Sequence, residues 1–145
     1  IYMADLSMKR KAYKTAATYY ETVLQLQPNH ALAMNNLAYL YQQTQDARAL
    51  PMAEKLLAQQ PNVPAVQDTV AMILLDAGQI QRAVDLLKKA TSKAPEQADI
   101  RIHLVQAYLR AGQKDKAKAE MQAITPKMQK SLDQTEFDKL TQQLK

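Results

Sequence analysis

The side chains that could do chemistry in this sequence are few and widely separated. Its two histidines, His30 and His103, lie far apart in the chain, and there is no cysteine. A zinc site needs three or four ligands that converge on one point, and no cluster of carboxylates accompanies either histidine. We therefore expect no metal site and no cofactor, and we assign both histidines surface or packing roles.

Nucleophilic catalysis and phosphate binding are equally unsupported by the pattern. The three serines, Ser7, Ser92 and Ser131, have no histidine close in sequence that could act as a base. The two glycines, Gly78 and Gly112, are 34 residues apart, so they cannot form the glycine-rich loop that cradles a phosphate. The sequence predicts a protein that is not an enzyme.

The glycines belong instead to a periodic pattern that runs along the chain. Three prolines close apolar stretches at intervals of 33 and 34 residues, namely Pro28, Pro61 and Pro95. Alanines keep step with them at Ala16, Ala49, Ala83 and Ala117. A period of this length is typical of helical repeats that stack as a solenoid, in which each repeat packs only on its neighbours.

Each period is predicted to form two antiparallel helices. Apolar residues between the markers recur at helical spacing, and no segment alternates as a strand would. A proline suits the point where a helix has ended, and a glycine suits a tight turn between two helices. In the second helix of a period, residues such as Ala83, Leu87 and Ala90 form the stripe that a buried helix face requires.

Composition and charge narrow the class of protein further. The 145 residues, of which 47% are apolar and 23% charged, fit one folded domain, and no run of eighteen apolar residues predicts a membrane span. The net charge of +5 comes from lysines and arginines placed at predicted turns and helix ends, around Lys9–Lys14, Lys88–Lys93 and Lys114–Lys118. Because few aromatic residues accompany these cations, nucleic acid is not an expected partner.

Laid over one another, the periods resemble the tetratricopeptide repeat (TPR), which carries a central alanine and ends in a proline. A small residue in the first helix recurs as Ala4, Ala38 and Ala71, and the large residue that fills the gap beside it recurs as Tyr41, Leu74 and Tyr108. The resemblance implies an all-α, right-handed TPR solenoid of antiparallel helix pairs with a C-terminal capping helix. We divide this single domain, residues 1–145, into a partial repeat 1–30, repeats 31–63, 64–97 and 98–126, and a capping helix 133–145.

Some positions depart from the TPR pattern. The tryptophan is replaced by Met34, Gln67 and Arg101. The second repeat is one residue short at its interhelix turn, and Pro51 soon follows, so its second helix is expected to start late or bend. In the last helix, Asp133 and Glu136 form a pattern like a capping box.

The resemblance also implies a concave groove lined by the first helix of each repeat. Carried onto this chain, the partner-binding positions combine amides, carboxylates and a few apolar anchors: Asn35, Asn36, Tyr39, Gln42, Asp68, Thr69, Met72, Ile102, His103 and Gln106. The cationic positions of the TPR clamp that holds acidic chaperone tails are not matched. We therefore predict a peptide or protein partner that is neutral or basic.

The expected function is a non-enzymatic scaffold for protein–protein interaction. A similarity to the C-terminal repeats of long bacterial TPR lipoproteins suggests a larger assembly linked to secretion or exopolysaccharide, in the periplasm or at the outer membrane rather than in the cytoplasm. The alternative is a structural spacer or oligomerisation segment of a longer TPR protein, with no ligand in its groove. Self-association through apolar residues of the partial repeat, Ile1, Met3 and Met8, is then expected.

Overall fold

The computed structural model describes the backbone of residues 2–145 and the side chains from residue 12 onward. All regular secondary structure in this part of the chain is helical, and the helices fall into two compact units that divide after Pro61. Apolar residues Ile1, Met3 and Met8, the basis of the predicted self-association, lie outside the described side chains.

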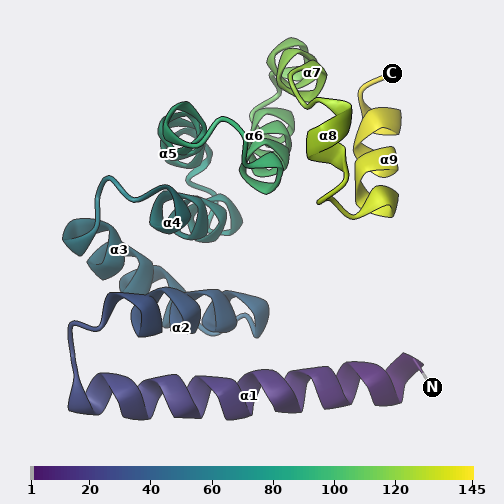
Figure 1. Ribbon diagram of the computed structural model, residues 1–145. Helices are drawn as coiled ribbons and strands as arrows, with labels where there is room; N and C mark the ends of the chain where they lie inside the picture. The colour runs from purple at the N-terminus through teal and green to yellow at the C-terminus, as the bar shows by residue number, and fades with distance from the viewer. Residues whose placement is uncertain (1) are drawn as a thin grey trace. The chain divides into compact units, whose positions relative to one another are not determined.

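The first unit consists of three helices packed in chain order (Figure 1). They are α1 (Tyr2–Leu26), α2 (Ala31–Gln43) and α3 (Ala49–Gln59). Helix α2 packs against both α1 and α3. His30 caps the N-terminus of α2, where its Nδ1 atom accepts a hydrogen bond of 3.1 Å from the backbone N–H of Ala33. The histidine therefore has a structural role as a helix cap.

Helix α1 corrects one expectation from the sequence. The basic stretch from Lys9 to Lys14 was expected around an interhelix turn, but it lies inside a continuous helix of 25 residues. No glycine or proline occurs between Tyr2 and Leu26, and alanine, lysine and arginine favour helix over most of this length. Because no residue in this stretch stops a helix, its position in the repeat is not enough to produce a turn.

The turn between α2 and α3 uses a glutamine where later turns use glycine. Gln45 has a φ of 56°, in the left-handed region, as Gly78 and Gly112 do with φ of 84° and 74°. Helix α3 starts at Ala49, whereas α5 starts three residues before its corresponding alanine, Ala83. The expected late start of this helix is confirmed. Pro51 therefore falls in the first turn, where its missing N–H forfeits no intrahelical bond.

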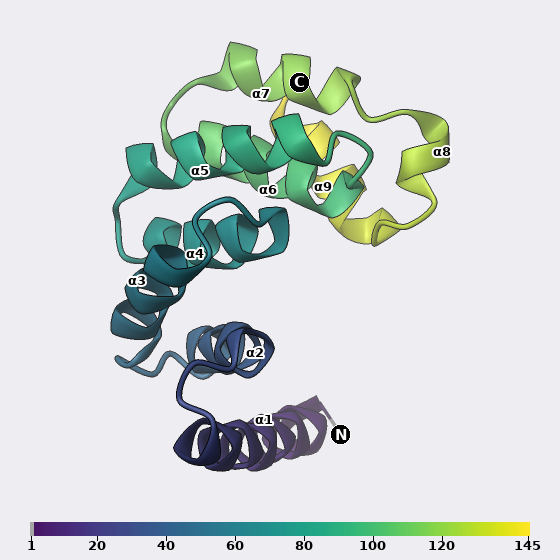
Figure 2. The ribbon, with the colours of Figure 1, turned by 60° about the vertical axis from the view of Figure 1, so that its left-hand side comes forward.

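The second unit contains two helix pairs followed by two further helices (Figure 2). Its elements are α4 (Pro64–Asp76), α5 (Ile80–Lys93), α6 (Ala98–Arg110), α7 (Lys114–Gln122), α8 (Pro126–Gln129) and α9 (Gln134–Gln143). Helices α4 and α5 form one pair, α6 and α7 the next, and α6 packs on both helices of the preceding pair. This arrangement is the stacking of neighbours that the period predicts.

The core of the second unit is made by the stripes read from the sequence. Ala83, Leu87 and Ala90 on α5 are all fully buried. On α4, Ala71 and Leu74, the small residue and the large one three positions later, are also fully buried. Truncating a buried leucine such as Leu87 to alanine typically costs about 2–5 kcal/mol of stability, so these positions hold the helix pairs together.

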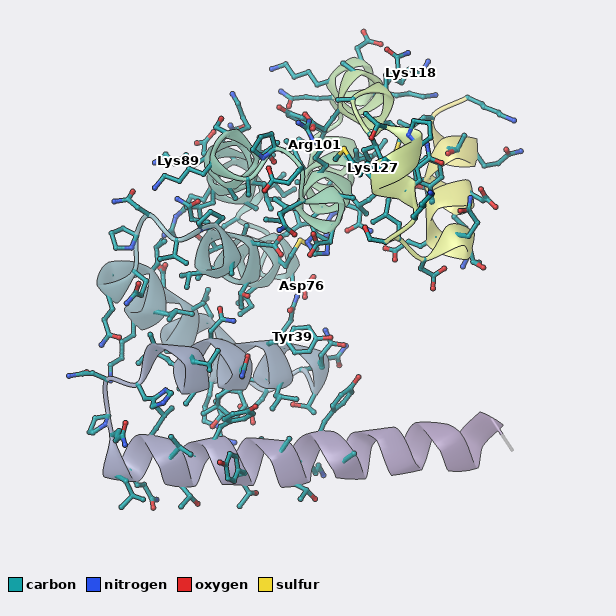
Figure 3. The ribbon with its side chains drawn as sticks, viewed as in Figure 1. Tyr39, Asp76, Lys89, Arg101, Lys118 and Lys127 are labelled. Atoms are coloured by element: carbon teal, nitrogen blue, oxygen red, sulfur yellow. The ribbon has the colours of Figure 1, made fainter. Side chains whose placement is uncertain are left out.

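Cationic side chains of the second unit lie on its outside. Lys89 on α5 and Lys118 on α7 are exposed and point away from the helices that carry them (Figure 3). Arg101 is different, because its side chain is only 16% exposed and its Nη1 atom lies 2.5 Å from the Oε2 atom of Glu120 on α7. Most of the positive charge is therefore solvated, as expected for helix surfaces.

Candidate functional site

The predicted groove residues come from three helices: α2 in the first unit, and α4 and α6 in the second. On α2, positions 35 and 36 lie four and three residues before position 39, and position 42 lies three residues after it, so all four share one side of the helix. The positions 68, 69 and 72 on α4, and 102, 103 and 106 on α6, are related in the same way. The local sequence thus places each group on one helix face.

In the first unit, two of the α2 side chains already have a defined environment. The Nδ2 atom of Asn36 donates a hydrogen bond of 3.2 Å to the hydroxyl of Tyr20 on α1. The Oδ1 atom of Asn35 is buried and has no hydrogen-bond partner among the described residues. Tyr39 is 46% exposed, and Figure 3 shows its ring directed out from α2. Gln42 is half-buried on the same face.

In the second unit, an ion pair joins α4 to α6. The Nδ1 atom of His103 lies 2.6 Å from the Oδ1 atom of Asp68, and these side chains are 30% and 16% exposed. Burial alone would lower the pKa of His103. The hydrogen bond to Asp68, together with the negative charges of Asp68, Asp99 and Glu136, outweighs this effect and raises the pKa of His103 above its usual 6.5.

The other predicted residues of the second unit differ in accessibility. Thr69 is half-buried and its hydroxyl donates to the backbone oxygen of Ala65 in its own helix. Met72 is half-buried as well. Ile102 is only 5% exposed, so it lies in the core and not at a surface where a partner could contact it. Gln106 is half-buried and donates a hydrogen bond of 2.8 Å from its Nε2 atom to the Oε1 atom of Glu136.

Glu136 and its helix were missing from the predicted site. The sequence pattern assigned Glu136 to a capping box, and half of this is correct, because the Asp133 side chain accepts a 3.1 Å hydrogen bond from the Glu136 backbone N–H. The Glu136 carboxylate accepts instead from Gln106 on α6. Leu140 on α9 and Leu144 at its C-terminal end are 5% and 6% exposed. A charged residue on an amphipathic helix gives no sequence signal for which neighbour it will contact.

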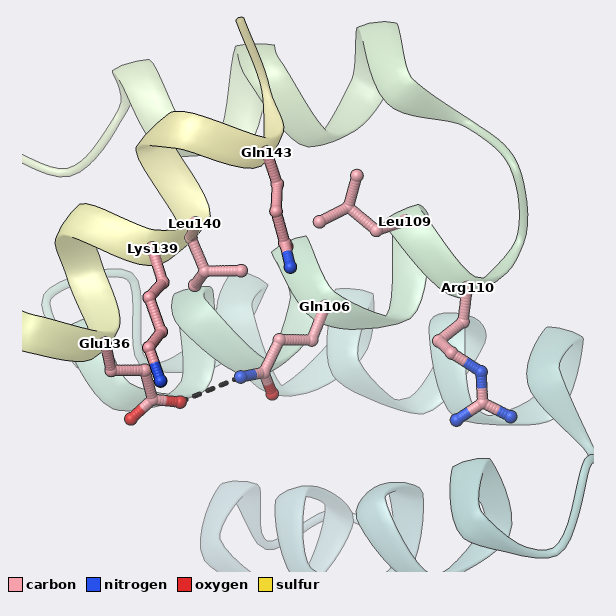
Figure 4. A pocket seen from close by; sticks show the side chains of 7 residues that line it. All are labelled: Gln106, Leu109, Arg110, Glu136, Lys139, Leu140 and Gln143. Carbon is pink, nitrogen blue, oxygen red and sulfur yellow. Dashed lines mark hydrogen bonds between the residues drawn. The ribbon is translucent and has the colours of Figure 1, made fainter.

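A cavity of about 410 Å³ lies between α6 and α9. Its wall is formed by three residues of α6 and four of α9, shown in Figure 4: Gln106, Leu109, Arg110, Glu136, Lys139, Leu140 and Gln143. The volume is within the range of small-ligand pockets, and the wall combines apolar and polar side chains. The arrangement can hold a ligand, and it contains no nucleophile paired with a base.

Two other properties of the described residues bear on function. They contain no group of three or more histidine, cysteine or acidic side chains arranged to bind a metal ion. Among the helices described, none has the length and apolar character needed to cross a bilayer.

Comparison with known families identifies the repeat. Two family profiles, both described as tetratricopeptide repeat, match residues 3–64 and residues 74–144. The chain is a tetratricopeptide-repeat protein. Between them the two matches span both TPR units, and they agree with the stacked helix pairs of the structure. A search of curated protein sequences gives no significant match.

Solved TPR structures share this fold at low sequence identity. TTC0263, a thermophilic TPR protein of Thermus thermophilus, is 20% identical, with a TM-score of 0.75 over 99% of this chain and 80% of its own. A MamA fragment from Desulfovibrio magneticus RS-1 is 22% identical, with a TM-score of 0.70 over 90% of this chain and 72% of its own. Another MamA structure is 18% identical, with a TM-score of 0.70 over 97% and 89% of the two chains. Likeness at this level establishes the TPR fold alone.

Membership of the TPR family gives the coarse function. TPR arrays are scaffolds for protein–protein interaction and are typically not enzymes, and their partners are proteins. The TPR tryptophan position is occupied here by Met34 and Gln67, each 1% exposed, and by Arg101, whose exposure is 16%. The position is thus buried in the second and third repeats and half-buried in the fourth, and the helix pairs form in spite of the replacements.

Proposed function

We propose that this chain binds a neutral or basic peptide segment of a partner protein along α4 and α6 of its second unit. The supporting observation is the concentration of negative charge around His103. Asp68, Asp99 and Glu136 come from three different helices, yet all three act on this imidazole. A lysine or arginine of a bound peptide would meet the same field, which favours a cation over an anion.

The first unit, taken by itself, carries groups of another kind that could contact a partner. Tyr39 is an exposed aromatic residue, and the half-buried Asn36 on the same face of α2 carries an amide group that could bond a peptide backbone. Amides that bond a peptide backbone and apolar anchors that receive its side chains are a common combination in peptide recognition. Met72 on α4 is the corresponding half-buried anchor of the second unit.

A direct test uses two capped peptides of opposite charge. The acetylated and amidated peptide with three alternating alanine–lysine pairs is compared with its alanine–glutamate counterpart by NMR titration of the ¹⁵N-labelled protein. The lysine peptide should shift the resonances of α4 and α6. Asp99→Asn should weaken the binding of this peptide about two- to five-fold, as expected for one exposed ion pair. Asp115→Asn on α7 removes an equal charge elsewhere and should have no effect. Equal binding of the glutamate peptide would overturn the proposal.

The alternative of a spacer without a ligand is favoured by one observation. Two predicted groove residues, His103 and Gln106, already bond to Asp68 and Glu136 of the same chain. If neither peptide perturbs the second unit, the spacer role gains support. The proposed link to an exopolysaccharide or secretion assembly has no support from the similarities found, so the functional proposal stops at peptide binding.

A further inference from the structure

His103 lies on the face of α6 that it shares with Gln106, between α4 on one side and α9 on the other (Figure 1). Its Nδ1 atom is 2.6 Å from the Oδ1 atom of Asp68 on α4, and its side chain is 30% exposed. One turn further along this face, Gln106 bonds to Glu136 on α9. The imidazole is therefore held in place by α4 and is still partly open to solvent within the proposed peptide-binding surface.

The acidic groups around His103 come from three helices. Asp68 on α4, Asp99 on α6 and Glu136 on α9 all favour the charged imidazole. Asp68 is only 16% exposed, whereas Asp99 and Glu136 are exposed and can be reached by a partner. The cluster has a net charge of −2 while His103 is protonated, because three carboxylates surround one imidazolium, and of −3 once the imidazole is neutral.

The other charged groups around α6 do not change this balance near neutral pH. Arg110 lies two turns beyond the imidazole and bonds to a backbone oxygen of α4. Lys139 on α9 lines the cavity beside α6 (Figure 4). Where α5 and α7 pack on α6, Asp85 and Glu120 act on Tyr108. Histidine is the side chain whose ordinary titration falls between about pH 5 and 8, so the imidazole sets how the charge of this surface varies with pH.

We propose that protonated His103 competes with the cationic side chain of a bound peptide, so that this surface binds a basic segment more tightly once the imidazole has lost its proton. Two cations that share the same carboxylates repel each other, and each weakens the binding of the other. A peptide lysine should therefore favour release of the histidine proton. The inference rests on the proposed peptide-binding function and adds its regulation by pH.

The test measures binding of one peptide at two pH values. The acetylated and amidated peptide of three alanine–lysine pairs is titrated at equal ionic strength, and binding is followed by the methyl NMR signals of Met72 and Ile102. Affinity at about pH 9 should exceed that at about pH 6 by about three-fold or more, as expected when one nearby like charge is removed. An alanine–glutamine peptide of the same length has no cation and should show no such change.

Two variants fix the charge at this position in opposite states. His103→Gln is neutral throughout and should bind the lysine peptide at both pH values as tightly as the unmodified protein does at the higher one. His103→Lys is cationic and should bind as weakly as the unmodified protein does at the lower pH. His30→Asn is the matched control, because it keeps an acceptor for the N-terminus of α2 in the first unit, and it should retain the pH dependence.

A reciprocal measurement needs only the unmodified protein. The ring signals of His103, followed by NMR from about pH 5.5 to about pH 9, should show a lower pKa with the lysine peptide bound than without it. Equal affinity at both pH values together with an unchanged pKa would overturn the inference and leave the proposed function standing. A lysine peptide that binds α4 and α6 at neither pH would remove both.

Discussion

His103 on α6 and Asp68 on α4 form an ion pair of 2.6 Å that connects the first helices of two successive repeats in the second unit. The pair is therefore a point at which the stability of the stack responds to protonation. Asp99, on the same helix, and Glu136, from α9, add negative charge around the imidazole.

The stability of the chain should fall as the pH rises past neutrality. Because the folded pKa of His103 lies above its unfolded value near 6.5, the stabilisation is complete below that value and is lost as the pH rises through the folded pKa. Denaturant unfolding monitored at pH values from about 5.5 to about 8.5 covers the window. His103→Gln should flatten the profile there, and parallel profiles for the two proteins would contradict this assignment.

Replacing Gln45 with glycine should stabilise the first unit. Gln45 is the one residue other than glycine with a positive φ in the described chain, and its hydrogen bonds match those of the glycine turns. The backbone N–H of Gln45 donates to the oxygen of Gln42 and that of Asp46 to the oxygen of Tyr41. Removing the Cβ atom should raise the free energy of unfolding by about 0.5–1 kcal/mol, measured by denaturant unfolding.

The reverse substitution tests the same physical cause in the second unit. Gly78 has a φ of 84°, and a Cβ atom built there meets no atom within 4 Å. Gly78→Ala should therefore cost about 1 kcal/mol through backbone conformation alone, without a packing clash. If the loss were several times larger, a contact and not the left-handed backbone would be responsible for the glycine.

The sequence was sufficient for the helix pairs because their ends carry chemical signals. Helices α1, α3 and α5 end at Leu26, Gln59 and Lys93, two residues before the repeating prolines. Where the signal is missing, prediction failed: α1 runs through the expected turn because nothing in it stops a helix. The turn at Gln45 has the same left-handed backbone as the turns at Gly78 and Gly112, although it lacks a glycine. The position in the repeat therefore predicts this turn, whereas the residue type does not.

The candidate site was harder to predict because it depends on contacts between distant helices. Repeat register placed Ile102 and Gln106 on the groove side of α6, but it carries no information about what packs over them. Gln106 bonds to Glu136, 30 residues later, and Ile102 lies beside a small cavity whose wall includes Phe137. Asp68 and His103 were both predicted, yet their pairing follows from how α4 and α6 stack, which a single sequence does not state.

Enlarging the small residue of α4 should disrupt the pairing of α4 with α5. Ala71 is fully buried, and Val105 is the fully buried residue at the same repeat position of α6. Ala71→Leu adds three carbons to a filled interior and should cost about 1–3 kcal/mol or more, whereas Val105→Leu adds one and should cost less. Thermal unfolding of both variants measures the difference. Similar losses would mean that the small residue is not what sets the α4–α5 distance.

Arg101 offers the clearest test of how a charged residue replaces the usual apolar residue of the repeat. Its Nη1 atom bonds to Glu120 at 2.5 Å and its Nε atom to the backbone oxygen of Pro95 at 2.7 Å, and both side chains of the pair are 16% exposed. Arg101→Met copies the methionine of the second repeat but leaves the Glu120 carboxylate without its cation in a largely buried place. The single variant should lose about 2–4 kcal/mol. Arg101→Met combined with Glu120→Met should recover most of this loss, since an apolar pair needs no desolvation of charge. A double variant as unstable as the single one would show that the bond to Pro95, and not the ion pair, is what holds this end of α6.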